Sequence, residues 1–247
     1  MLRVIIVLAG LILSLASARL PDRLEAVYDV SFGLLGKVGQ SHAVLDVQHG
    51  RYRISIDMKA SGMADSLSGH RREKHISEGV VKNGKLVARR YEVVRTYKNK
   101  KVKKVYRFDP KKRKIFKIYE KYENNRRYAH QESVLPYYSE DDLLTLYFNL
   151  DRYINKRTPG HYRFKAAGAE RQGGFVEVIV PTASQRGKYE EDLGKGAAWY
   201  ATAIIHQKLF TDNEGRLELA VGSDGITQKA LIKDVALFGD VTAVRVK

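Results

Sequence analysis

The stretch that decides the fold reads SEDDLLTLYFNLDRYI and runs from Ser139 to Ile154. Its leucines and tyrosines recur at intervals of three and four residues, which places them on one face of a helix. Ser139, followed three residues later by Asp142, resembles a capping box, and Pro136 cannot lie inside the helix that follows it. The pattern predicts an amphipathic helix over residues 139–154, the one convincing helix of the chain.

The sequence on either side of this helix is typical of short antiparallel strands. Apolar and polar residues alternate over 24–32 and 52–58, and Asn83-Gly84 is a hairpin signal between two strand-like runs. A later strand is predicted over 199–210. About a dozen such strands predict a mainly β protein, because a long meander commonly curls to manage its edges. We expect a strongly curved antiparallel sheet or half-open β-barrel, with the helix packed in its concavity.

The first 18 residues have the pattern of a signal peptide. Arg3 gives a positive start, residues 4–15 are apolar, and Ala16-Ser17-Ala18 is a small-residue cleavage site. The apolar run is short, because about 20 residues are needed to cross a bilayer, and a retained anchor is the alternative. The sequence predicts cleavage after Ala18 and a periplasmic protein with a single domain over 19–247. A division into two domains at the helix is the other possibility.

Positive charge is concentrated in one region of the chain. Between Lys82 and Arg127 there are 19 Lys and Arg residues but 4 Asp and Glu residues. The rest of the chain holds 25 Lys and Arg residues and 24 Asp and Glu residues, so it is almost neutral. Basic residues interleaved with aromatic ones suit nucleic acid, but an exported protein meets little of it. We therefore predict a lipid, an anionic membrane surface or an acidic envelope polymer as the partner. A merely solvated strand face is the alternative.

Two sets of residues are the candidate binding sites. The candidate anionic-surface residues are Lys101, Lys103, Lys104, Lys111, Lys112, Arg113 and Lys114. The candidate lining of an apolar ligand slot is the helix face of Leu143, Leu146, Tyr147 and Leu150. The same four residues serve equally well as the core face of the helix.

Motifs for catalysis and for cofactors are absent from the sequence. The seven histidines are scattered without metal-ligand spacing, and the chain has no cysteine and therefore no disulfide or thiol chemistry. Glu190, Glu191 and Asp192 are adjacent, whereas a glycosidase pair must converge from separate elements. The sequence predicts no catalytic residue, no metal and no cofactor.

Three stretches of the sequence carry a resemblance to a known family. Asp141 to Phe148 is similar to the D-x-L-S-x-L-Y segment of the DUF3108 family, a group of exported bacterial proteins of unassigned function. Residues 217–246 resemble its closing segment, and residues 28–39 resemble its opening hairpin. The chain has Thr145 where Ser is frequent, and Thr227-Gln228 where Pro is usual. The resemblance implies an exported, mostly β protein and carries over no catalytic residue.

These features predict an exported, non-catalytic periplasmic protein that binds or carries a lipid-like or anionic envelope component. One alternative is a structural or assembly factor of the cell envelope, which binds a protein or an acidic glycan through its basic face. The other alternative is a hydrolase whose site the sequence does not reveal.

Overall fold

The computed structural model describes residues 21–206, 214–235 and 239–247. The predicted signal peptide, residues 1–18, and its cleavage site after Ala18 lie outside the described residues. The predicted strand over 199–210 is present as Trp199–His206, and its remaining positions also lie outside the described residues.

All fourteen strands of the described residues join one antiparallel sheet in the order β8-β7-β6-β5-β4-β3-β2-β1-β14-β13-β12-β11-β10-β9. They are β1 (Arg23–Phe32), β2 (Lys37–Gln48), β3 (Arg51–Ala60), β4 (Arg72–Lys82), β5 (Lys85–Tyr97), β6 (Lys100–Asp109), β7 (Lys114–Glu123), β8 (Arg126–Val134), β9 (Gly160–Lys165), β10 (Phe175–Val180), β11 (Trp199–His206), β12 (Glu214–Val221), β13 (Thr227–Val235) and β14 (Gly239–Arg245). The predicted mainly β, curved antiparallel sheet is confirmed. It stays open, with β8 and β9 as its two ends.

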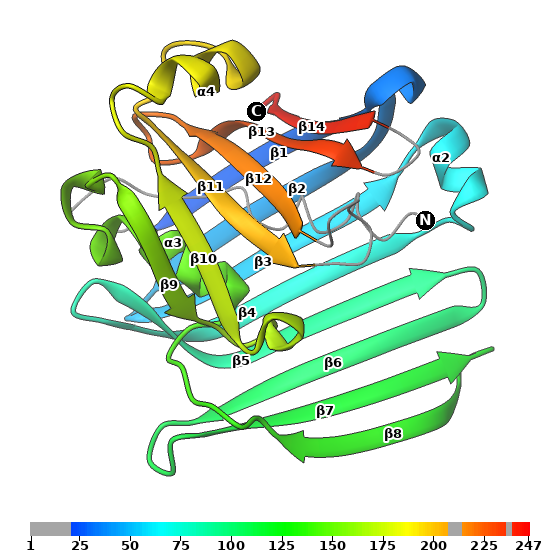
Figure 1. Cartoon of the computed structure of the whole chain (residues 1–247). Coiled ribbons are helices and arrows are strands. Elements are labelled where there is room, and N and C mark those ends of the chain that lie inside the picture. The colour runs from blue at the N-terminus through cyan, green and yellow to red at the C-terminus, as the bar shows by residue number, and fades with distance from the viewer. Residues whose placement is uncertain (1–20, 207–213, 236–238) are drawn as a thin grey trace.

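The sheet folds over on itself, so that β9–β14 lie across β1–β5 (Figure 1). Strand alternation decides what fills the space between the two layers. In β1, Ala26, Tyr28 and Val30 are buried, while the residues between them are half-buried on the outer face. β6, β7 and β8 continue beyond the covering layer and form an extension of the sheet (Figure 1). This extension contains most of the basic region of the sequence.

Helix α3 (Leu143–Tyr153) lies between the two layers of the sheet (Figure 1). It begins later than predicted, because Asp142 and not Ser139 is the residue that caps it. The Ser139 hydroxyl donates to the carbonyl of Lys165 instead, at 2.7 Å. Thr145 completes the capping box, since its hydroxyl accepts from the backbone N–H of Asp142 at 2.8 Å.

Burial of α3 extends beyond the predicted apolar face. Leu146, Tyr147 and Leu150 are buried as expected, but Leu144 and Phe148 on other sides of the helix are buried too. The reason is that a helix between two layers of sheet has apolar neighbours on more than one side. Two further short helices, α2 (Gly62–Leu67) and α4 (Arg186–Leu193), lie near the edges of the molecule (Figure 1).

Candidate functional site

The buried carboxylate of Asp142 is held by three hydrogen bonds. Its Oδ1 accepts from the backbone N–H groups of Leu144 and Thr145, at 2.8 and 3.1 Å, and its Oδ2 accepts from the Ser77 hydroxyl at 2.5 Å. Burial raises the pKa of Asp142 to about 7, although these hydrogen bonds act in the opposite direction. The contact with Ser77 of β4 connects the start of α3 to the sheet.

The neighbouring carboxylate of Asp141 is also buried and also fully engaged. It accepts from the Asn149 amide at 2.8 Å and from the Tyr153 hydroxyl at 2.6 Å. Burial raises its pKa to about 6. Two acids with raised pKa values often indicate an active site. Here the oxygens of both carboxylates accept hydrogen bonds from groups of α3 or, for Asp142, also from Ser77 of β4, so the pair anchors the helix.

The structure brings together the four residues predicted to line an apolar slot. Leu143, Leu146, Tyr147 and Leu150 face four apolar residues of the covering layer: Val176, Val178, Ala203 and Leu219. The space between the two groups is about 20 Å³. That is room for about one water molecule, whereas ligand pockets have volumes of about 300 Å³ or more. A lipid-sized ligand would therefore have to displace α3, and the slot remains a prediction.

The seven predicted anionic-surface residues lie in three different places. Lys101 and Lys103 are on the outer face of β6, while Lys104, the next residue, points to the inner face because side chains alternate along a strand. The other four, residues 111–114, form the turn and strand start at the far end of the β6–β7 hairpin. The set is therefore not one continuous surface.

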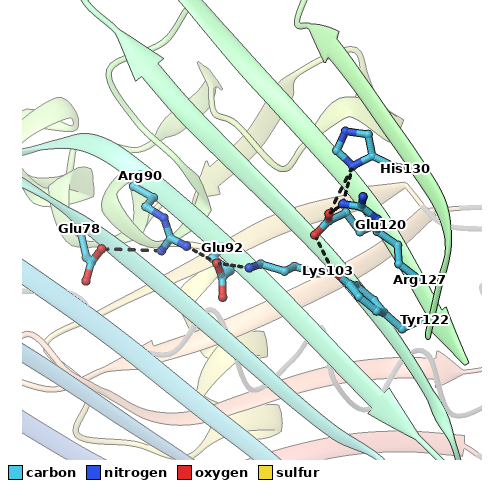
Figure 2. A network of polar contacts seen from close by, with 8 residues as sticks. All are labelled: Glu78, Arg90, Glu92, Lys103, Glu120, Tyr122, Arg127 and His130. Carbon is cyan, nitrogen blue, oxygen red and sulfur yellow. Dashed lines mark hydrogen bonds and ion pairs between the residues drawn. The ribbon is translucent and has the colours of Figure 1, made fainter. Parts of the chain in front are cut away.

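Carboxylates pair with several cations on the outer face of β4–β8, as Figure 2 shows. Arg90 contacts both Glu78, at 3.7 Å, and Glu92. Lys103 lies 3.5 Å from the same Glu92. Lys101 stands 4.2 Å from the centre of an aromatic ring, that of Tyr122. The cations in the middle of this face are therefore already engaged within the protein.

A second group in Figure 2 is centred on Glu120 of β7. Its carboxylate accepts from Arg127 at 2.8 Å and from the Tyr122 hydroxyl at 3.0 Å, and His130 lies 3.3 Å away. The hydrogen bond from Arg127 is the main reason that the pKa of Glu120 falls to about 2. Glu120 is therefore ionised under ordinary conditions, and it balances charge near the exposed edge of the sheet.

The end of the β6–β7 hairpin differs from the rest of this face. Lys111, Lys112 and Lys114 are exposed, and none of their side-chain ammonium groups forms an ion pair with a carboxylate of the described residues. The Arg113 guanidinium stands 5.0 Å from the ring centre of Tyr138. These side chains are free to meet an external anion.

Beside this turn, one row of outer-face residues runs across three strands. Arg107 of β6 is opposite Phe116 of β7, which is opposite Val134 of β8. Phe116 is 38% exposed and Val134 is 47% exposed. We call this row and the adjoining turn the tip surface. It consists of Arg107, Lys111, Lys112, Arg113, Lys114, Phe116 and Val134.

A separate hollow of about 620 Å³ lies on the outer face of β1–β5. It is lined by Glu25, Val27, Gln40, His42, Asp57, Met58, Lys59, Arg72, Glu73, Lys74, Val94 and Thr96. Most of its charges are matched internally. Lys74 is 3.0 Å from Asp57, and His42 is 2.9 Å from Glu25. Its size suits a small molecule.

Within the described residues, no group of three or more His, Asp or Glu side chains is arranged to hold a metal ion. The described helices also include none that is long and apolar enough to span a membrane.

Comparison with known proteins agrees with the resemblance seen in the sequence. A family model described as a protein of unknown function, DUF3108, matches residues 27–202. The chain belongs to the DUF3108 family. None of the curated proteins compared with this DUF3108 protein matches it.

Among solved structures, this DUF3108 protein is similar to a crystal structure from Brucella abortus described as a beta-barrel-like protein of domain of unknown function DUF1849. The two share 12% sequence identity, with a TM-score of 0.53 over 93% of this chain and 97% of the other. At this identity the similarity concerns the fold alone.

Sequence reasoning on this DUF3108 protein missed the hollow and the ion pairs of Figure 2. Both features depend on which strands are neighbours in the sheet and on the register in which they pair. The sequence gives neither the strand order nor the register. The tip surface was only half recognised. The run of cations from Lys111 to Lys114 was visible, whereas Phe116 and Val134 are separated in sequence and meet only through the pairing of β7 with β8.

Proposed function

We propose that this DUF3108 protein is an exported, non-catalytic binding protein of the bacterial cell envelope, which docks on an anionic lipid surface through its tip surface. The observation that carries the proposal is the contrast within the basic region. Cations in the middle of the outer face contact carboxylates or an aromatic ring, while those of the tip surface have no carboxylate partner among the described residues.

The chemistry of the tip surface suits a membrane better than a soluble anion. Five cations lie next to two exposed apolar side chains, Phe116 and Val134. Each Lys or Arg near an anionic membrane contributes about 1 kcal/mol, so the five together supply several kcal/mol of attraction. Apolar side chains add affinity when they enter the boundary between headgroups and acyl chains. A purely ionic partner would gain nothing from them.

The position of the tip surface supports the same proposal. It lies at the end of the β6–β7 hairpin, in the extension of the sheet (Figure 1). Lys111, Lys112, Lys114, Phe116 and Val134 are all exposed, so an external surface can reach their side chains. The predicted signal peptide would bring the protein to a compartment bounded by anionic lipid.

The test is co-sedimentation with vesicles of phosphatidylcholine alone and of phosphatidylcholine mixed with phosphatidylglycerol, at low and high salt. Binding should need the anionic lipid and should weaken with salt, because exposed charges are screened. Equal binding to both vesicles, or no binding to either, would contradict the proposal.

A second candidate function rests on β8. This strand is the last of the open sheet, and every residue from Arg126 to Val134 except Ala129 is exposed. An unpaired edge is a template for strand addition by another protein, as an envelope assembly factor would use it. Hydrogen exchange tests this directly: the outward amides of β8 should exchange quickly in the isolated protein and slowly when a partner strand is bound.

A further inference from the structure

The inner face of β5–β7 carries a second group of cations, separate from the tip surface. Strand register makes Arg95 of β5 and Lys117 and Lys121 of β7 diagonal neighbours of Lys104 in β6. Diagonal neighbours on one face of a sheet are about 7 Å apart, within reach of long side chains. We call these four residues the inner cluster.

Two carboxylates lie near the inner cluster, and each is already used. Glu73 is buried, with Arg95 Nε at 2.5 Å and His75 Nε2 at 2.7 Å. Burial opposes its ionisation, yet His75 and Arg95 keep the pKa of Glu73 below its ordinary value. Glu170 of η3 (Glu170–Gln172) forms an ion pair with Lys117 at 2.9 Å.

The other two cations of the inner cluster have no carboxylate partner among the described residues. Lys121 lies 5.6 Å from the ring centre of Tyr119, and Lys104 is half-buried. Burial lowers the pKa of Lys104; Glu170 opposes this effect, and the positive charges of Arg95 and Lys117 add to it. A lysine in such surroundings loses hydration without a carboxylate in direct ion-pair contact, which is unfavourable.

We propose that the inner cluster is a binding site for a phosphoryl group, with Lys104 and Lys121 as its direct contacts. A phosphate carries up to two negative charges and several acceptor oxygens, so it matches two lysines that have no ion-pair partner in the described part of the chain and that lie beside the cations Arg95 and Lys117. Arg95 and Lys117 add attraction while staying bound to their own carboxylates. This inference goes beyond the proposed function and uses none of the tip-surface residues.

Isothermal titration calorimetry with inorganic phosphate tests the site in the purified, full exported chain. We expect saturable binding of one phosphate, weakened at least tenfold in Lys104→Met. The matched control is Lys82→Met, which removes an exposed lysine from the end of β4 and should leave the affinity unchanged. Equal phosphate affinity in Lys104→Met and the unchanged protein would overturn the proposal.

Thermal unfolding separates a lost site from a misfolded variant. Phosphate should raise the melting temperature of the unchanged protein and of Lys82→Met, because a ligand that binds only the folded state stabilises it. It should leave the melting temperature of Lys104→Met unchanged. Without phosphate that variant should melt no lower than the unchanged protein, because a half-buried charge has been removed.

Dihexanoyl phosphatidate distinguishes the two sources of a phosphoryl group. Binding at least tenfold tighter than that of inorganic phosphate assigns the site to a lipid headgroup, and equal affinity assigns it to a free phosphate. Absence of saturable binding for both probes would overturn the inference. A variant with residues 111–114 changed to Ser should bind both probes normally, so this inference and the proposed function fail in different experiments.

Discussion

Asn149 of α3 makes two hydrogen bonds to the backbone of Leu86 in β5. Its amide nitrogen donates to the Leu86 carbonyl at 2.9 Å, and its amide oxygen accepts from the Leu86 N–H at 3.0 Å. A side chain of the helix thus replaces a neighbouring strand for one residue of the sheet. The same amide nitrogen reaches Asp141 at 2.8 Å, so the contact joins strand, helix and helix start.

Asn149→Ala should lower the free energy of unfolding by about 2–5 kcal/mol, because each buried polar group left without a partner costs about 1–3 kcal/mol. Chemical denaturation measures the loss. Asn99→Ala is the matched control, since Asn99 makes an exposed hydrogen bond to Asn124 at 2.9 Å and its removal should cost far less. Equal losses in the two variants would show that the contact with Leu86 does not stabilise the fold.

Tyr147 provides the corresponding contact to the covering layer. Its hydroxyl lies 2.5 Å from the Thr227 hydroxyl of β13. Tyr147→Phe and Thr227→Val should each destabilise the protein, and a double-mutant cycle should give a coupling of about 0.5–1.5 kcal/mol. Strictly additive effects would mean that α3 is not tied to β13 through this pair.

Stability should fall as pH rises from about 4 to about 7. Burial keeps protons on Asp141 and Asp142, with pKa values of about 6 and about 7 against an ordinary 3.8, so the folded state holds protons that the unfolded chain has released. Each such proton changes the unfolding free energy by about 1.4 kcal/mol per pH unit. Above the folded pKa values both states are ionised, and the loss levels off.

Asp142→Asn should flatten this dependence, because the amide replaces the carboxyl without a titrating proton. Urea unfolding at several pH values between about 5 and about 8 gives the slope directly. The part of the pH dependence that comes from Asp141 should remain in the variant. A slope equal to that of the unchanged protein would show that Asp142 is already ionised in the folded state.

Sequence periodicity was sufficient to predict the fold class. Each strand buries one face, so apolar side chains recur at every second residue along it. Strand alternation also separates Lys103 from Lys104, so their divergence could have been read from the sequence. The helix start could not be placed so easily. Ser139 and Asp142 are both good caps, and only the hydrogen bond from Ser139 to Lys165 decides between them.

The candidate site was less accessible to sequence reasoning. The pairing of Lys103 with Glu92 depends on the register of β5 against β6. Without that register, the cations that form ion pairs cannot be distinguished from those of the tip surface, which form none within the described residues. A long basic run therefore indicated an anionic partner without showing which of its cations are free.

Vesicle co-sedimentation of a tip-surface variant tests the central claim most directly. The variant changes Lys111, Lys112, Arg113 and Lys114 to Ser, and its charge-matched control changes four exposed lysines elsewhere: Lys59, Lys98, Lys188 and Lys195. We predict that binding to phosphatidylglycerol vesicles is lost in the first and largely kept in the second, with nearly unchanged melting temperatures for both. Equal loss in the two variants would show that net charge alone drives binding, and would contradict a docking role for the tip surface.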